Sequence, residues 1–208
     1  MGISNLSAAL KRKTVLYKDY VEVGYFYGGK RIGIDVSNLS YMKNSQVIRS
    51  LTQNFSILEY RIDPHKQTQA WLNSMFDTIF TFMAVGALPV LIFDGPHKTS
   101  KEATLVKRRA QREKYINQKE ELEARLDAAD IMNRSEDDVL RLVRVVCNLN
   151  FVHEEQGIRF RNLVSNLNLP HVFAYGEGEK VAASLYQECF DGTSAPWSWM
   201  MSDPHEMN

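Results

Sequence analysis

Acidic residues stand where several apolar stretches of this sequence end, and carboxylates gathered in this way can hold metal ions. The candidate ligands are Asp35, Asp94, Glu177, Glu179 and Asp203. Carboxylates brought together repel one another unless a cation neutralises them. Oxygen ligands without cysteine or clustered histidine favour Mg²⁺ or Mn²⁺ over zinc, and two such ions can activate water for phosphodiester hydrolysis. A single aspartate after a strand is also a common helix cap, and this alternative stays open for Asp35 or Asp203 taken alone.

A basic segment follows Asp94. Between Lys98 and Lys119 there are eight Lys or Arg residues against two Glu, whereas from Glu120 to Asp138 eight acidic residues stand against two arginines. Lys101 and Arg108 are seven residues apart and therefore share a helix face. Such a helix suits a phosphate backbone, and the candidate contacts are Lys98, Lys107, Arg109 and Arg112. A solvated hairpin whose halves attract each other explains the same pattern.

Strands must place these acidic residues. Short apolar runs predict strands at Arg31–Val36, Pro89–Asp94, His171–Tyr175 and Trp197–Met201. Alternation of strands with helices predicts an α/β fold with a mainly parallel central sheet flanked by helices. In such a sheet functional groups gather beyond the carboxyl ends of the strands, where all five acidic residues fall.

Helices must connect the strands. Apolar residues at helical spacing predict a helix from Gln67 to Val85, ended by Gly86, with Trp71, Phe76 and Phe80 in the core. A helix of small residues is expected from Lys180 to about Phe190, and charged helices from Lys98 to about Val146. His153–Glu155 is interpreted as a surface turn.

Composition sets limits on the class of protein. The 208 residues suit a single domain, and 25 basic residues balance 25 acidic ones, so any attraction for nucleic acid must be local. The longest uncharged stretch, Thr78–Phe93, has 16 residues, fewer than the roughly 20 that a membrane helix needs. Two cysteines, without metal-ligand spacing, fit an intracellular protein.

Two other motifs are incomplete. Asp35–Ser40 approaches the D-x-S-x-S ion site of adhesion domains, but Leu39 replaces the second serine. Gly176–Gly178 would begin a dinucleotide fingerprint, but Val181 stands where the third glycine belongs.

Taken in order, these segments resemble the flap-endonuclease family of structure-specific 5′ nucleases. Met1–Leu6 is similar to the family's N-terminus, Arg31–Asp35 and Val90–Gly95 to its first two metal-site strands, and Gly176–Ala183 to its E-x-E motif. Lys101 and Arg108 stand seven and fourteen positions after Asp94, as in the family's helical arch. The tryptophan-containing segment before Asp203 resembles homologues of large DNA viruses, of poxvirus or iridovirus type, more than it resembles cellular members.

The resemblance implies a PIN-like 5′ nuclease fold with one nuclease domain over residues 1–208 and a helical arch at about 98–146. It implies two Mg²⁺ ions, for which Mn²⁺ can substitute, held by the five acidic residues. Lys101 and Arg108 would be catalytic, and Gly2 would lie near the DNA. Branched or flap DNA in replication, repair or recombination is the expected substrate. The expected location is the nucleus of a cell, or the host cytoplasm or nucleus for a viral protein.

Departures from the family pattern fall near the C-terminus. After Asp203 the family's D-x-D motif would need a second carboxylate where His205 stands, and only Glu206, one position later, could substitute. The family continues with a further metal-binding aspartate and a helix-hairpin-helix element, which we expect to be missing here. A sliding clamp is left open as a partner, although the sequence shows no clamp-binding peptide.

Three functions are therefore weighed. The first is a Mg²⁺-dependent 5′ flap endonuclease and 5′–3′ exonuclease. The second is a non-catalytic or truncated homologue that binds DNA junctions, which the departures at His205 and the C-terminus suggest. The third is an RNA-directed 5′ nuclease, which the spacing of Lys101 and Arg108 disfavours.

Overall fold

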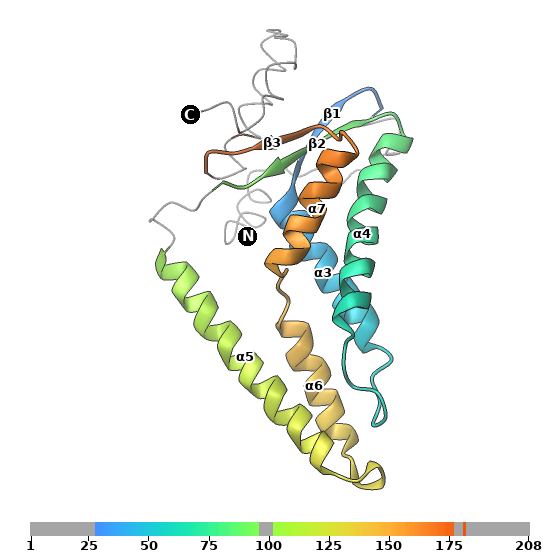
Figure 1. Ribbon diagram of the computed structural model, residues 1–208, viewed down its shortest axis with the longest axis vertical. Helices are drawn as coiled ribbons and strands as arrows, with labels where there is room; N and C mark the ends of the chain where they lie inside the picture. Colours follow the sequence, from blue (N-terminus) through green and yellow to red (C-terminus); the bar gives the residue numbers. More distant parts are fainter. Residues whose placement is uncertain (1–27, 96–101, 177–180, 182–208) are drawn as a thin grey trace, which may run out of the picture.

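The computed structural model describes residues 28–95, 102–176 and 181. Its elements are β1 (Arg31–Asp35), α3 (Val36–Thr52), α4 (Pro64–Ala84), β2 (Leu88–Phe93), α5 (Glu102–Ala128), the short 3-10 helix η2 (Ile131–Asn133), α6 (Glu136–Asn148), α7 (Glu154–Asn166) and β3 (His171–Phe173). The strands lie at one end of an elongated molecule, next to α3, α4 and α7. The hairpin of α5 and α6 extends to the opposite end (Figure 1).

The sheet confirms the predicted α/β class. Its three strands are parallel and lie in the order β1-β2-β3, with Asp35 paired to Ile92 and Phe93 paired to Phe173. All three predicted strands in the described residues are present, each ending one or two residues earlier than expected. The fourth, Trp197–Met201, lies outside the described residues, as does all of the helix expected from Lys180 except the helical Val181.

Local signals explain where α4 begins and ends. Asp63 caps its first turn by accepting hydrogen bonds from the backbone of His65 (2.8 Å) and Lys66 (3.4 Å). Pro64 occupies the first helical position, where no backbone donor is needed. Gly86, with a φ of 78°, takes the left-handed conformation that follows the helix. The helix therefore starts three residues before the predicted Gln67 and stops where the glycine indicated.

One hydrophobic core, which we call the sheet core, lies between the sheet and helices α3, α4 and α7. Trp71, Met75 and Ile79 of α4 are almost fully buried in it with Phe160 of α7. The placement of Trp71 and Phe76 in the core is confirmed, since Phe76 packs against the cluster. The placement of Phe80 was wrong: it stacks on Phe76 at 5.7 Å but is 46% exposed.

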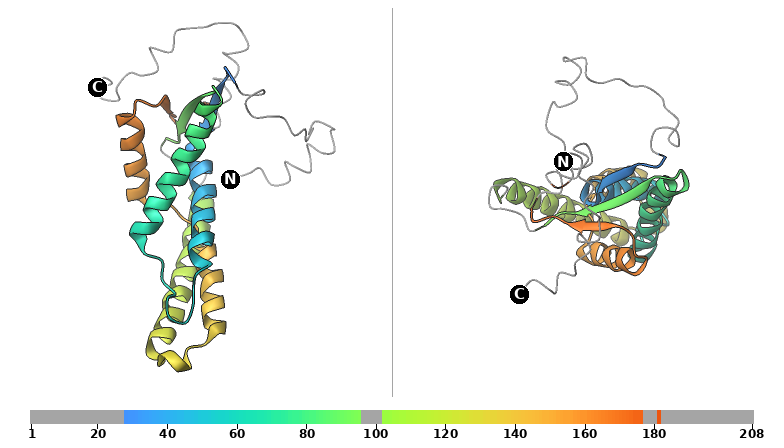
Figure 2. Two further views of the ribbon diagram at one scale, coloured as in Figure 1. Left: turned by 90° about the vertical axis from the view of Figure 1, so that its right-hand side faces the viewer. Right: turned by 90° about the horizontal axis from the view of Figure 1, so that it is seen from above.

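A second cluster, the hairpin core, fastens the α5–α6 hairpin to the body. Its buried members are Ile48, Tyr60, Leu122, Leu126, Val139, Leu142 and Val146. They come from α3, the segment after it, the second half of α5, and α6. The charged segment that was predicted to be helical is thus a helical hairpin. Its α6 helix and the second half of α5 pack through apolar residues. Seen from above, the start of α5 projects beyond the helices around the sheet (Figure 2).

Hydrogen bonds among polar and charged side chains connect the tip of the hairpin to the segment after α3. The Tyr60 hydroxyl and the Arg61 guanidinium both donate hydrogen bonds to the Asp127 carboxylate. Arg134 donates to the carbonyl oxygens of Leu126 and Ile57, each at 2.8 Å. The hydrogen bonds from Tyr60 and Arg61 lower the pKa of Asp127, and the bond to Asp127, together with burial, raises the pKa of Tyr60. We call these four residues the Tyr60 clasp: Tyr60, Arg61, Asp127 and Arg134.

Helix α7 begins where a turn was expected. His153 is its N-cap residue, and Glu154 and Glu155 form its first turn. The interpretation of His153–Glu155 as a turn was therefore wrong, whereas its placement at the surface is confirmed, since all three residues are exposed. Acidic residues in the first turn interact favourably with the helix dipole. None of the helices within residues 28–95 and 102–176 has the length and apolar character needed to cross a membrane.

Candidate metal and nucleic-acid site

Asp35 lies at the carboxyl end of β1 and orients its side chain through α3. One carboxylate oxygen accepts from the Asn38 backbone NH at 2.9 Å, and the other accepts from the Asn38 side-chain amide at 2.7 Å. Asp35 is therefore a helix cap, as the simpler interpretation proposed. Capping does not use up its acceptor capacity, because an ionised carboxylate has about four lone-pair sites. Asn38 thus holds the carboxylate in a fixed orientation, as second-layer residues do around metal ligands.

Asp94 follows β2 at the same edge of the sheet. Asp35 pairs with Ile92, so Asp94 lies two residues further along the neighbouring strand, a rise of about 7 Å. The Asp94 side chain is exposed, whereas Val90, Leu91, Ile92 and Phe93 before it are buried. The parallel register therefore brings these two predicted ligands to adjacent strand ends.

The backbone beyond β2 stays joined to the backbone beyond β3. Ala174 NH donates to the Phe93 carbonyl, and Gly95 NH donates to the Gly176 carbonyl, both at 2.9 Å. A Cβ atom on Gly95 would lie 1.9 Å from the Ala174 carbonyl oxygen, so this close approach requires glycine. Gly176, the residue before the predicted ligand Glu177, is thereby fixed beside the residue after Asp94.

The other predicted site residues lie outside the described part of the chain. They are the ligands Glu177, Glu179 and Asp203, the catalytic Lys101, and the DNA contacts Gly2 and Lys98. These assignments stay predictions. Within the described residues there is no cluster of three or more acidic, histidine or cysteine side chains that could hold a metal ion.

The donor set at the sheet edge fits Mg²⁺ or Mn²⁺. Asp35 and Asp94 offer hard carboxylate oxygens, and no described histidine or cysteine joins them. Proteins commonly bind magnesium through one or two carboxylates while the ion keeps several waters. Asp35 and Asp94 can therefore supply the protein ligands of one such ion. The acidic residues expected next to Gly176 have the same chemistry.

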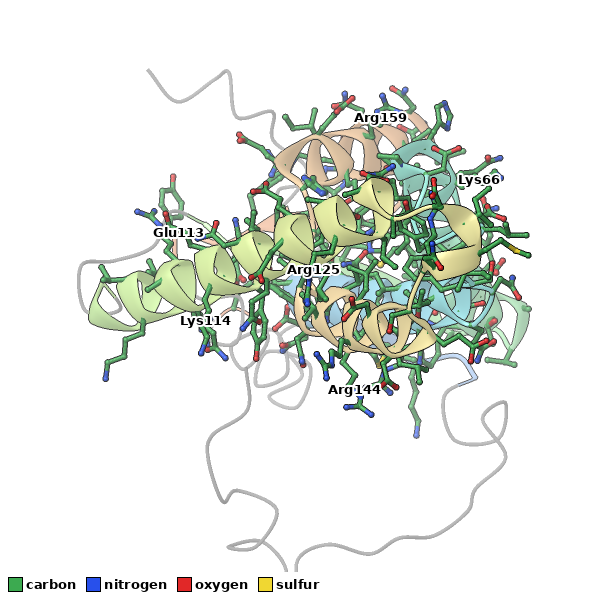
Figure 3. All side chains as sticks on the ribbon, turned by 90° about the horizontal axis from the view of Figure 1, so that it is seen from below. Lys66, Glu113, Lys114, Arg125, Arg144 and Arg159 are labelled. Carbon is green, nitrogen blue, oxygen red and sulfur yellow. The ribbon has the colours of Figure 1, made fainter. Side chains whose placement is uncertain are left out.

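The first half of α5 carries the predicted cations. Lys107, Arg108 and Arg109 are exposed and belong to the first half of α5. The start of α5 projects beyond the helices around the sheet (Figure 2). Figure 3 shows Glu113 and Lys114 further along this projecting part, whereas Arg125 lies where α5 packs against α6. The prediction that these cations contact DNA stays a prediction.

Arg112 has a contact that the sequence did not suggest. Its guanidinium lies 3.9 Å from the centre of the Phe151 ring, in the segment that links α6 to α7. Its charge is thus directed toward an aromatic face of the protein itself.

Arg161 of α7 is a cation near the sheet edge that sequence reasoning missed. Its guanidinium lies over the rings of Phe93 and Phe173, at 5.7 and 5.6 Å. Arg161 thus lies against aromatic side chains near the ends of β2 and β3. The sequence shows an arginine shortly before the third predicted strand. The local pattern does not show which residues its side chain contacts.

Comparison with known proteins agrees with the sequence motifs. The family model of the XPG N-terminal domain matches residues 1–115, more than half of the 208 residues. No curated protein matches the chain. Among solved structures, the catalytic core of Rad2 in complex with a DNA substrate is similar, with 16% identity and a TM-score of 0.42.

That alignment covers 80% of this chain and 38% of the Rad2 chain. The family assignment rests on the XPG N-terminal domain model. The match over residues 1–115 includes Asp35, Asp94 and the cationic start of α5. The chain belongs to the XPG N-terminal domain family.

Proposed function

We propose that this chain carries the metal-binding site of a structure-specific 5′ nuclease that hydrolyses a phosphodiester in flap or branched DNA. The observation that carries the proposal is the placement of Asp35 and Asp94 at adjacent ends of parallel strands. Helix α5, whose first half carries an excess of cations, begins at Glu102, eight residues after Asp94. Carboxylates that hold divalent ions can activate water for phosphodiester hydrolysis, and cations that follow them in the chain can bind the phosphates.

The residues divide the work of the site. Asp35, oriented by Asn38, and Asp94 would hold divalent ions with Glu177, Glu179 and Asp203. Divalent ions held there supply Lewis acidity that activates a water and stabilises the leaving oxygen. Asp35 and Asp94 also keep the phosphate from approaching unless their charge is neutralised, so binding and metal loading are coupled.

Cations of α5 would act on the substrate's phosphates. Arg108, with Lys101 on the same predicted helix face, would stabilise the negative charge that develops on the scissile phosphate. Lys107 and Arg109 would contact neighbouring phosphates. Because each phosphate contact releases counterions, affinity should fall steeply as salt rises.

A cleavage assay tests the proposal. The full chain is incubated with a 5′-labelled DNA flap in Mg²⁺ or in EDTA, and compared with the Asp94→Asn and Asp77→Asn variants. Asp77 is an exposed carboxylate in the middle of α4, so its change controls for lost surface charge. Wild type and Asp77→Asn should cut in Mg²⁺ only, and Asp94→Asn should lose at least about a hundredfold in rate.

Other outcomes separate the alternatives. Flap binding that survives EDTA, without cutting by any variant, would replace the nuclease with a junction-binding homologue. Faster cutting of an RNA flap of matched shape would change the substrate class. Cleavage of DNA that is unaffected by Asp94→Asn would contradict the proposed site.

A further inference from the structure

The short segment Leu149–Val152, which links α6 to α7, is held from several sides by polar side chains. Asn44 of α3 is fully buried and donates to the Asn150 side-chain oxygen at 2.9 Å and to the Phe151 carbonyl at 3.0 Å. Asn150 in turn donates to the Tyr41 carbonyl at 3.1 Å, and Gln67 of α4 donates to Asn44 at 3.2 Å. Buried amides satisfied in this way rigidify what they join. The segment is therefore fixed to α3, the helix that Asp35 caps.

Phe151 presents its ring from this fixed segment to α5. The guanidinium of Arg112 lies 3.9 Å from the ring centre, the distance of direct stacking, whereas Arg134 and Arg161 lie 5.3 Å or more from the rings they face. The ring also contacts His153, with 4.2 Å between centroids. Arg112 is thus attached to a support that does not belong to the hairpin.

Arg112 lies far along α5 from the hairpin core, so its contact can restrain the direction of the helix. The hairpin core includes α5 only from Leu122 onward, ten residues after Arg112 and therefore about 15 Å further along the axis. Arg108 precedes Arg112 by four residues and lies on the same helix face. Stacking at Arg112 therefore adds a restraint on the direction of the exposed half of α5, about three helical turns before the hairpin core begins.

We propose that Arg112 is a positioning residue: its stack on Phe151 fixes the cationic half of α5, and with it Arg108, relative to the carboxylates at the sheet edge. The proposal rests on the proposed function for its catalytic consequence. Under this proposal the stack on Phe151, rather than a phosphate contact, is the main role of Arg112.

Three variants distinguish positioning from phosphate binding. Arg112→Ala removes the cation, Phe151→Leu removes the aromatic face without changing charge, and Arg109→Ala removes an exposed neighbouring cation as the control. Arg112→Ala and Phe151→Leu should each lower kcat for flap cleavage about fivefold, with little change in KM. The double variant should lose no more than either single one, because both remove the same contact.

Salt dependence gives the second readout. Arg109→Ala should reduce the slope of log affinity against log salt by about one, whereas Arg112→Ala and Phe151→Leu should leave the slope unchanged. Phe151→Tyr keeps the ring and should retain wild-type turnover, which shows that the segment still folds. A lower slope in Arg112→Ala together with normal turnover in Phe151→Leu would make Arg112 a phosphate contact and overturn the proposal.

Amide hydrogen exchange tests the stack without any substrate. In the free protein, Arg112→Ala and Phe151→Leu should speed exchange at residues 105–115 and leave residues 122–128 unchanged. If exchange changes in this way but the chain cuts no DNA, the proposed function is refuted and the positioning contact of Arg112 with Phe151 is supported. Unchanged exchange at residues 105–115 in both variants would overturn the positioning role whether or not the chain is a nuclease.

Discussion

The two halves of α5 have similar charge density but different surroundings. In the first half Lys107, Arg108 and Arg109 are exposed to solvent and Val106 is 57% exposed. In the second half Leu122 and Leu126 are buried, at 5% and 1% exposure. The first half thus leaves Lys107, Arg108 and Arg109 exposed, whereas the second half attaches the helix to the body through its apolar residues.

The treatment of charge differs in the same way. Charges of the second half are paired, as in Arg125 with Asp138 at 3.7 Å and Lys119 with Glu123 at 3.1 Å. The Tyr60 clasp adds Asp127 to these pairs. One continuous helix thus combines a structural half and a half suited to binding, and the boundary lies near Lys119. Substitutions in the two halves should therefore affect different measurements.

The largest effect on stability should come from the buried half. Leu126→Ala removes a fully buried side chain from the hairpin core and should lower the free energy of unfolding by about 2–5 kcal/mol. Val106→Ala, in the exposed half, should change it by less than about 0.5 kcal/mol. Urea unfolding followed by circular dichroism measures both. Equal losses for the two variants would show that α5 packs along its whole length.

A smaller and opposite contrast is expected for DNA binding. Arg108→Ala should weaken affinity for flap DNA roughly tenfold and reduce the salt slope by about one, because it removes a phosphate contact. Arg125→Ala removes the same charge from the same helix, where it is paired with Asp138. It should leave affinity and slope unchanged in fluorescence anisotropy titrations. A loss of affinity as large in Arg125→Ala would place DNA along the whole helix.

The smallest effect should depend on pH. The folded pKa of Asp127 is lowered, so its bonds stabilise the fold above the unfolded value near 3.9 and are lost as pH falls through the folded pKa. The pKa of Tyr60 is raised, so its contribution is lost only as pH rises through that pKa. Tyr60→Phe should thus lower unfolding stability at pH 7, and its difference from wild type should shrink toward pH 2.5. A difference independent of pH would mean that the clasp contributes no charge interaction.

The sequence predicted elements whose buried faces are made of apolar residues. β2 is buried on both faces and therefore reads as the continuous run Val90–Phe93, and α4 repeats Trp71, Met75 and Ile79 at helical spacing. Helices α3 and α7 were not predicted, because polar residues interrupt their buried faces. Asn44 and Gln156 are buried there, at 0% and 3% exposure. Two of the partners of Asn44, Asn150 and Phe151, are more than a hundred positions away, which local patterns do not reveal.

The candidate site was predictable to the same extent. Asp35 and Asp94 were found because parallel strands end at a common edge, a rule that needs no side-chain detail. Asn38 was recognisable in principle, since it stands three residues after a capping aspartate. Arg161 and the stack of Arg112 on Phe151 were not, because each joins segments whose proximity depends on the tertiary fold.

A divalent-metal site at the Asp35 and Asp94 edge of the sheet is the basis of the proposed function, and titration with Mn²⁺ tests it most directly. Electron paramagnetic resonance of the full chain should show bound Mn²⁺, and Asp35→Asn and Asp94→Asn should each weaken binding by at least about tenfold. Asp77→Asn, which changes an exposed carboxylate of α4, should bind as the wild type does. Equal Mn²⁺ affinity in all four proteins, or no binding by the wild type, would contradict the assignment of Asp35 and Asp94 as ligands.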